Sequence, residues 1–183
     1  MHQQNPASTE TLRRKKEKKR PDPDDLEAAR AKALALLTNR PRGSSELARK
    51  LRGAGFSSTA SQTVVSRLTE VGLVDDQDLV ERWVAEQVAS GRGKSVIRQK
   101  LAGRGLWSAE AALIVDSHCD AGAELQRAVE LAERRLGRLK GDRASVYGRL
   151  TRFLAQRGFS GDAVFEAART AMKEFSEGSL DHD

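Results

Sequence analysis

The sequence predicts an all-α protein of three tandem three-helix repeats, elongated and curved, with a disordered basic N-terminal tail. Three observations support this. No proline, the residue that most strongly breaks helices, occurs after Pro41 in the 183 residues. Apolar residues recur every three or four positions, as at Leu79, Trp83, Val84 and Val88. Aromatic residues make up only 4% of the chain, which is too few for the thick core of a β-sandwich.

A pattern of two aliphatic residues and a glycine, each four positions apart, occurs three times. The copies begin at positions 47, 97 and 150, so the period is about 50 residues. Two aliphatic residues at this spacing lie on one face of a helix, and the glycine ends that helix in the left-handed conformation. The three copies are Leu47, Leu51 and Gly55; Ile97, Leu101 and Gly105; and Leu150, Leu154 and Gly158.

Each copy of this pattern predicts the middle helix of a three-helix unit. An amphipathic segment precedes each copy, at 25–38, 77–89 and 123–139, and predicts the first helix. A serine follows each glycine (Ser57, Ser108 and Ser160) and predicts the N-cap of the third helix. Because a 50-residue unit buries little core alone, neighbouring units should stack. The predicted repeats are 24–72, 73–119 and 120–176, between a disordered tail at 1–23 and a flexible C-terminus at 177–183.

The positive charge is concentrated at the N-terminus. The whole chain has a net charge of +6, and residues 1–20 hold seven basic and two acidic residues, which leaves 25 basic and 24 acidic residues elsewhere. A block of like charges with few apolar residues predicts disorder. Such a tail either attracts DNA phosphates non-specifically or is a solvated extension. Its basic residues are Arg13, Arg14, Lys15, Lys16, Lys18, Lys19 and Arg20.

The sequence contains no recognisable catalytic or metal-binding pattern. Two of the three histidines lie near the ends of the chain, and the third, His118, adjoins the single cysteine, Cys119. Adjacent residues do not face each other on a helix, so we expect this pair to close a helix rather than to act chemically. We therefore expect no enzyme activity, cofactor or metal. One cysteine forms no internal disulfide, which favours the cytoplasm, and no apolar run is long enough to span a membrane.

Two further motifs resemble phosphate or metal sites. Gly93-Lys94-Ser95 resembles the end of a phosphate-binding loop, but Val88 stands where that loop requires its first glycine. A helix ending at Gly91 and a new helix opening near Gly93 explain this stretch better. Asp75, Asp76 and Asp78 suggest a Mg²⁺ site, but their position before an amphipathic segment favours capping of a helix N-terminus.

Basic residues cluster in the second repeat. Several lie on common helical faces and, with one residue from the preceding helix, suit an acidic protein or phosphate groups. The alternative interpretation is a solvated helix face. The candidate partner-binding residues are Arg82, Arg92, Lys94, Arg98, Lys100 and Arg104.

A series of short motifs runs over residues 28–172. The motifs are Ala33-Leu34-Ala35-Leu36-Leu37, Arg40, Ser45-Glu46-Leu47, Lys50-Leu51, Val74-Asp75-Asp76, Trp83-Val84, Gly91-Arg92-Gly93, Ile97-Arg98, Leu101, Arg104-Gly105-Leu106 and Arg157-Gly158-Phe159-Ser160. In their order and spacing they resemble the bacterial RecX regulatory proteins. The chain departs from the family pattern at Leu79, Val80 and Gln87.

The resemblance implies a small regulatory protein that binds the RecA recombinase along its filament on single-stranded DNA. Such proteins usually inhibit RecA ATP hydrolysis and strand exchange in recombination, DNA repair and the SOS response. We expect a cytoplasmic monomer whose partner is the RecA filament, with at most weak contact to DNA alone. The alternative is a direct DNA-binding protein whose repeats act as helix-turn-helix-like readers. The near balance of charge after residue 20 and the few aromatic residues count against this alternative.

Overall fold

The computed structural model describes residues 22–174, and every regular element in this range is a helix. Residues 1–21 of the predicted tail at 1–23, and the predicted C-terminus at 177–183, lie outside these residues. The helices follow one another in three groups of three, with a short 3₁₀ helix, η2 (Met172–Glu174), at the end. They are α1 (Leu26–Asn39), α2 (Ser44–Gly53) and α3 (Ser58–Glu70); α4 (Asp76–Ala89), α5 (Lys94–Arg104) and α6 (Ala109–His118); and α7 (Ala121–Leu136), α8 (Arg143–Arg157) and α9 (Gly161–Ala171).

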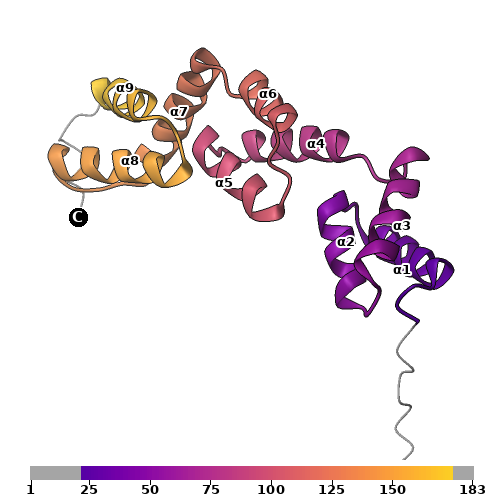
Figure 1. Cartoon of the computed structure of the whole chain (residues 1–183). Coiled ribbons are helices and arrows are strands. Elements are labelled where there is room, and N and C mark those ends of the chain that lie inside the picture. The colour runs from indigo at the N-terminus through magenta and orange to yellow at the C-terminus, as the bar shows by residue number, and fades with distance from the viewer. Residues whose placement is uncertain (1–21, 175–183) are drawn as a thin grey trace, which may run out of the picture.

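The three groups form an elongated, curved row rather than a globule (Figure 1). The middle helix of each group, α2, α5 or α8, lies toward the inner side of the arch. The predicted fold class, an all-α array of three-helix repeats that is elongated and curved, is therefore confirmed. We call the contact between α1–α3 and α4–α6 the first joint, and the contact between α4–α6 and α7–α9 the second joint.

Each repeat has its own apolar core. Three separate clusters of buried side chains form within the described residues, one for each group of three helices. The aliphatic pair of each middle helix lies at the centre of its cluster, because the four-residue spacing puts both side chains on the same face. All six of these side chains are completely buried: Leu47, Leu51, Ile97, Leu101, Leu150 and Leu154.

The predicted caps form at the ends of these helices. The hydroxyl oxygens of Ser57, Ser108 and Ser160 each accept a hydrogen bond from a backbone N–H in the first turn of α3, α6 or α9. The glycines that follow the middle helices, Gly55, Gly105 and Gly158, all have positive φ, where an L side chain is strained. Asp75 caps α4 by accepting from the backbone N–H of Asp78, as predicted for the acidic cluster.

Two middle helices begin without a side-chain cap of their own. The N-cap residues of α2 and α5 are Gly43 and Gly93. A Cβ atom at Gly93 would lie 2.3 Å from main-chain atoms of Gly158 and Phe159 in the next repeat. Gly93 is therefore required by close packing at the second joint and not by an unusual φ.

Candidate interaction surface

The middle helices bury an apolar face in their own cores and lie toward the inner side of the arch (Figure 1). On α2, α5 and α8 together, eleven residues are basic and one, Glu46, is acidic. The other six α-helices contain eight basic and thirteen acidic residues. The near-zero net charge of the folded part thus hides a strong separation of charge between helices.

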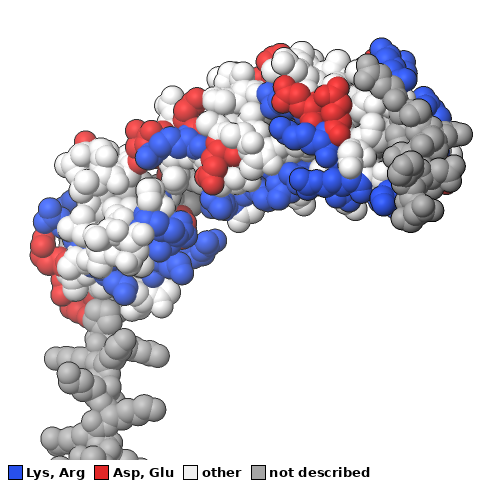
Figure 2. All heavy atoms as spheres, turned by 180° about the vertical axis from the view of Figure 1, so that it is seen from behind, with Lys and Arg blue, Asp and Glu red and all other residues white. Residues whose placement is uncertain are grey.

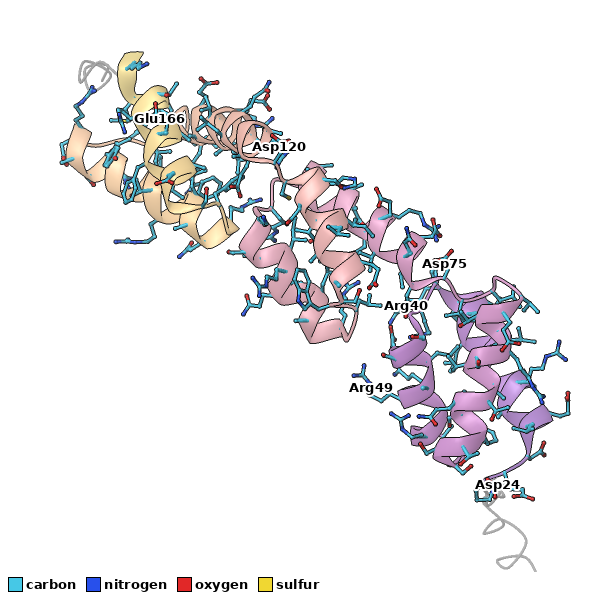
Figure 3. All side chains as sticks on the ribbon, turned by 45° about the horizontal axis from the view of Figure 1, so that its top comes forward. Asp24, Arg40, Arg49, Asp75, Asp120 and Glu166 are labelled. Atoms are coloured by element: carbon cyan, nitrogen blue, oxygen red, sulfur yellow. The ribbon has the colours of Figure 1, made fainter. Side chains whose placement is uncertain are left out.

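We call the basic residues of the three middle helices the basic edge. In the view from behind, Lys and Arg side chains follow the inner, lower edge of the arch (Figure 2). Figure 3 shows Arg49 projecting from α2 away from the first repeat. The basic edge consists of Arg49, Lys50, Arg52, Lys94, Arg98, Lys100, Arg104, Arg143, Arg149, Arg152 and Arg157.

Aromatic rings hold two of the predicted partner-binding residues in place. The guanidinium carbon of Arg98 lies 5.1 Å from the centre of the Trp107 ring, and that of Arg104 lies 4.8 Å from the centre of the Trp83 ring. An aromatic face stabilises a cation without pairing it with a negative charge, so the positive charge is not compensated. Both arginines are exposed and remain available to an anionic partner.

Two more predicted residues lie on the same helix, α5. The ammonium of Lys94 lies 2.9 Å from the carboxylate of Asp116, and this hydrogen bond raises the pKa of Lys94. Lys100 is exposed and donates a long hydrogen bond of 3.4 Å to the side-chain oxygen of Gln87. The structure therefore brings Lys94, Arg98, Lys100 and Arg104 together on one helix.

The remaining two predicted residues lie off this helix. Arg82 lies on α4, where it pairs with the carboxylate of Asp78 one turn earlier. Arg92 lies half-buried in the turn between α4 and α5. Neither belongs to the basic edge as defined here.

Sequence analysis missed the basic residues of α2 and α8. Reasoning on the second repeat alone overlooked Arg49, Lys50 and Arg52 in the first repeat and Arg152 in the third. The signal was available in the repeat register, since the helices that carry the second and third copies of the aliphatic–glycine pattern contain no Asp or Glu. Comparing the charges of equivalent helices would have revealed the edge.

The structure also places the other groups that sequence analysis tested for chemistry. His118 ends α6 and Cys119 is its C-cap, as predicted. The His118 Nε2 atom lies 3.2 Å from a Glu81 carboxylate oxygen, whereas the Cys119 thiol is buried, and burial raises its pKa. Among residues 22–174, no three His, Cys, Asp or Glu side chains are grouped to hold a metal ion. No helix in the same range is both long and apolar enough to cross a membrane.

Comparison with known proteins identifies the family. Residues 29–68 match the model of the first three-helix domain of RecX, and residues 123–168 match that of the third. "Regulatory protein RecX" of Mycobacterium sp. (strain KMS) is 39% identical over 150 residues, covering 76% of this chain and 81% of the relative. The protein of the same name from Mycobacterium avium (strain 104) is 37% identical over 148 residues, covering 79% and 85%.

Solved structures share the fold. A crystal structure of RecX from Lactobacillus salivarius aligns with a TM-score of 0.69 and 23% identity, over 81% of this chain and 97% of that chain. A second structure, of a regulatory protein RecX, aligns with a TM-score of 0.70 and 19% identity, over 79% and 73%. With relatives this similar over most of their length, the chain belongs to the RecX family of regulatory proteins.

Proposed function

We propose that this protein regulates the RecA recombinase by lying along the RecA filament on single-stranded DNA, and that it lowers ATP hydrolysis and strand exchange. The observation that carries the proposal is the charge of the middle helices, which hold eleven basic residues and one acidic residue, together with the Lys and Arg side chains that line the inner edge of the arch in Figure 2. A filament that carries DNA phosphates is a long anionic partner, and such an edge suits it. Membership of the RecX family supports RecA as the protein partner.

The proposal assigns the contact to residues from all three repeats. The predicted residues Lys94, Arg98, Lys100 and Arg104 supply the centre of the basic edge, and α2 and α8 extend it in both directions. The other two predicted residues, Arg82 on α4 and Arg92 in the turn before α5, stay candidates beside the edge. Because the binding free energy is then spread over a long edge, no single charge should dominate it. A test therefore has to change one residue in each repeat.

The test variant reverses one exposed charge per repeat: Arg49→Glu, Lys100→Glu and Arg152→Glu. These side chains were chosen because they avoid the two arginine–tryptophan contacts that support the second repeat. The measurement is the protein concentration that halves RecA ATP hydrolysis on single-stranded DNA. If each reversal removes about 0.5–1 kcal/mol, that concentration should rise roughly tenfold to a hundredfold.

A matched variant controls for the change of net charge. Lys32→Glu, Arg67→Glu and Arg134→Glu reverse three exposed charges on α1, α3 and α7, outside the basic edge. This variant should inhibit RecA at nearly the wild-type concentration. Equal loss in both variants would show that net charge, and not the edge, governs the effect. No inhibition by the wild-type protein at a concentration equal to that of RecA would reject the proposal.

Direct DNA binding is a second candidate. The near-zero net charge after residue 20 counted against it, but the separation of basic and acidic residues between helices favours it. The same edge would contact phosphates without RecA, and its affinity would fall steeply with salt. Co-sedimentation with RecA filaments, beside DNA alone across a salt series, separates the two functions. Binding to filaments that persists at a salt concentration where binding to DNA is lost supports the RecA function.

A further inference from the structure

We infer that the molecule consists of a stiff pair of repeats, α4–α9, to which the first repeat, α1–α3, is joined by a hinge, with the carboxylate of Asp76 acting as the latch. The inference rests on the different bonds that cross the two joints. It does not depend on which partner the basic edge binds.

Main-chain bonds hold the second joint together. The N–H of Gly93 donates to the carbonyl of Arg157 at 2.8 Å, and the N–H of Ser95 donates to the carbonyl of Gly158 at 3.1 Å. The backbone around the start of α5 is therefore fastened directly to the backbone at the end of α8. Neither bond can be lost through a change of side-chain rotamer.

Two side chains reinforce this joint. The guanidinium of Arg157 donates to the carbonyl of Ser90 at 3.0 Å and also lies over the ring of Phe153, at 5.1 Å from its centre. The buried carboxylate of Glu124 accepts from the N–H of Lys94 at 3.4 Å and so caps α5 from the next repeat. Four hydrogen bonds, three to the end of α8 and one to the start of α7, thus fix the α4–α5 turn and the start of α5 against the third repeat.

The first joint has the same design but far fewer bonds. Asp76 at the start of α4 accepts from the N–H of Ser44 at 2.7 Å and also from the Ser44 hydroxyl, so it caps α2 as Glu124 caps α5. Within the described residues, no other hydrogen bond or ion pair joins 22–74 to 75–119. In Figure 3 a single connecting loop crosses this joint near the labelled Arg40 and Asp75.

The packing around Asp76 is made by side chains: a Cβ at Gly43 would lie 2.5 Å from Leu106 Cδ2, whereas a Cβ at Gly93 would meet main-chain atoms. Unlike main-chain atoms, a leucine side chain can change rotamer. A hollow of about 390 Å³ separates parts of α1 and α4 and is lined by Leu37, Leu73 and Leu79 among others. A second hollow, of about 430 Å³, lies beside Ser44 and Asp76 on the first repeat. The apolar clusters are separate at both joints, so the hydrogen bonds that cross each joint make the difference between them. Units that share little buried surface are expected to move relative to each other.

Movement at this hinge would displace one part of the basic edge. Arg49, Lys50 and Arg52 travel with the first repeat, whereas the basic residues of α5 and α8 stay fixed relative to each other. The spacing of charges along the arch can therefore adapt at its N-terminal third only.

Distances between spin labels test the inference in the full chain. In a Cys119→Ala background, one pair of labels at Thr59→Cys and Gln99→Cys spans the first joint, and another at Gln99→Cys and Gln156→Cys spans the second; all three sites are exposed. Double electron–electron resonance should give a distance distribution about twofold broader across the first joint than across the second. Equal widths would overturn the inference.

Removing the latch sharpens the test. Asp76→Ala should broaden the 59–99 distribution further and leave the 99–156 distribution unchanged. Asp78→Ala is the matched control, because it also removes an acidic residue from the first turn of α4 but breaks no bond across the joint. An unchanged 59–99 distribution in Asp76→Ala would show that Asp76 is not the latch. The unchanged 99–156 pair reports that the rest of the chain is folded.

Discussion

Replacing Gly93 with alanine should separate the second and third repeats. The new Cβ would lie 2.3 Å from the carbonyl carbon and oxygen of Gly158, and these main-chain atoms cannot rotate away. Reaching an ordinary contact of 3.4 Å requires a shift of about 1 Å, which is enough to break the 2.8 Å hydrogen bond from Gly93 to Arg157. The lost bond costs about 1 kcal/mol and the overpacking about 1–3 kcal/mol. We expect a loss of about 2–4 kcal/mol in the free energy of unfolding.

Urea unfolding followed by circular dichroism at the helix band measures this loss. The control is Gly103→Ala, since Gly103 lies inside α5, the helix that begins after Gly93, and a Cβ there meets nothing within 4 Å. That change should stabilise the protein by about 0.5–1 kcal/mol, because alanine is the better helix former. If Gly93→Ala unfolds at the wild-type urea concentration, the close approach at the second joint does not constrain the molecule, and the reasoning is refuted.

Three further predictions concern single side chains. Leu101→Ala should lower the free energy of unfolding, measured in urea, by about 2–5 kcal/mol, because this side chain is fully buried. Leu113→Ala, at a side chain that is 71% exposed, should change it little. Equal effects would contradict the assigned core. The Cys119 thiol should react slowly with iodoacetamide at pH 8 until the protein is unfolded, since burial raises its pKa; equal rates in native and unfolded protein would disprove this. Burial alone would raise the pKa of Glu46, but the guanidinium groups of Arg40 and Arg42 outweigh burial and lower that pKa. At pH 7 the wild type should therefore be more stable than Glu46→Gln, and this difference in the free energy of unfolding should shrink as the pH falls below 4.5. A gap in stability that does not shrink at all as the pH is lowered through the acid range would contradict that last assignment.

Helices and their ends were predictable because their causes are local. The spacing of Leu47 and Leu51 defines a buried face, and Ser57 and Gly55 mark the adjoining ends, so a few neighbouring residues were enough. The first helix of the third repeat was expected over 123–139 but ends at Leu136, because Gly137 is its C-cap. Apolar spacing continues past this glycine and does not reveal the end of the helix.

The joints were not predictable, because their causes are distant in the sequence. Asp76 was correctly expected at the start of a helix, but its bond to Ser44, 32 residues earlier, depends on how two repeats meet. Gly93 was expected only to open a helix, and its contact with Gly158 appears only in the folded array. The basic edge was predictable in part. Its residues can be read from the sequence, but only the stacking of the repeats shows that the three middle helices lie along one edge.

The separate apolar clusters also bear on how the chain folds. Each cluster closes within about 50 residues of sequence, so almost no contact that a core requires must wait for a distant segment. During synthesis, the first repeat can complete its core once α3 and the buried Val74 have emerged, before the residues of the third repeat exist. The second joint is different, because Gly93 and Ser95 find their carbonyl partners only after α8 has formed. Docking of the second repeat against the third should therefore be the last step of folding.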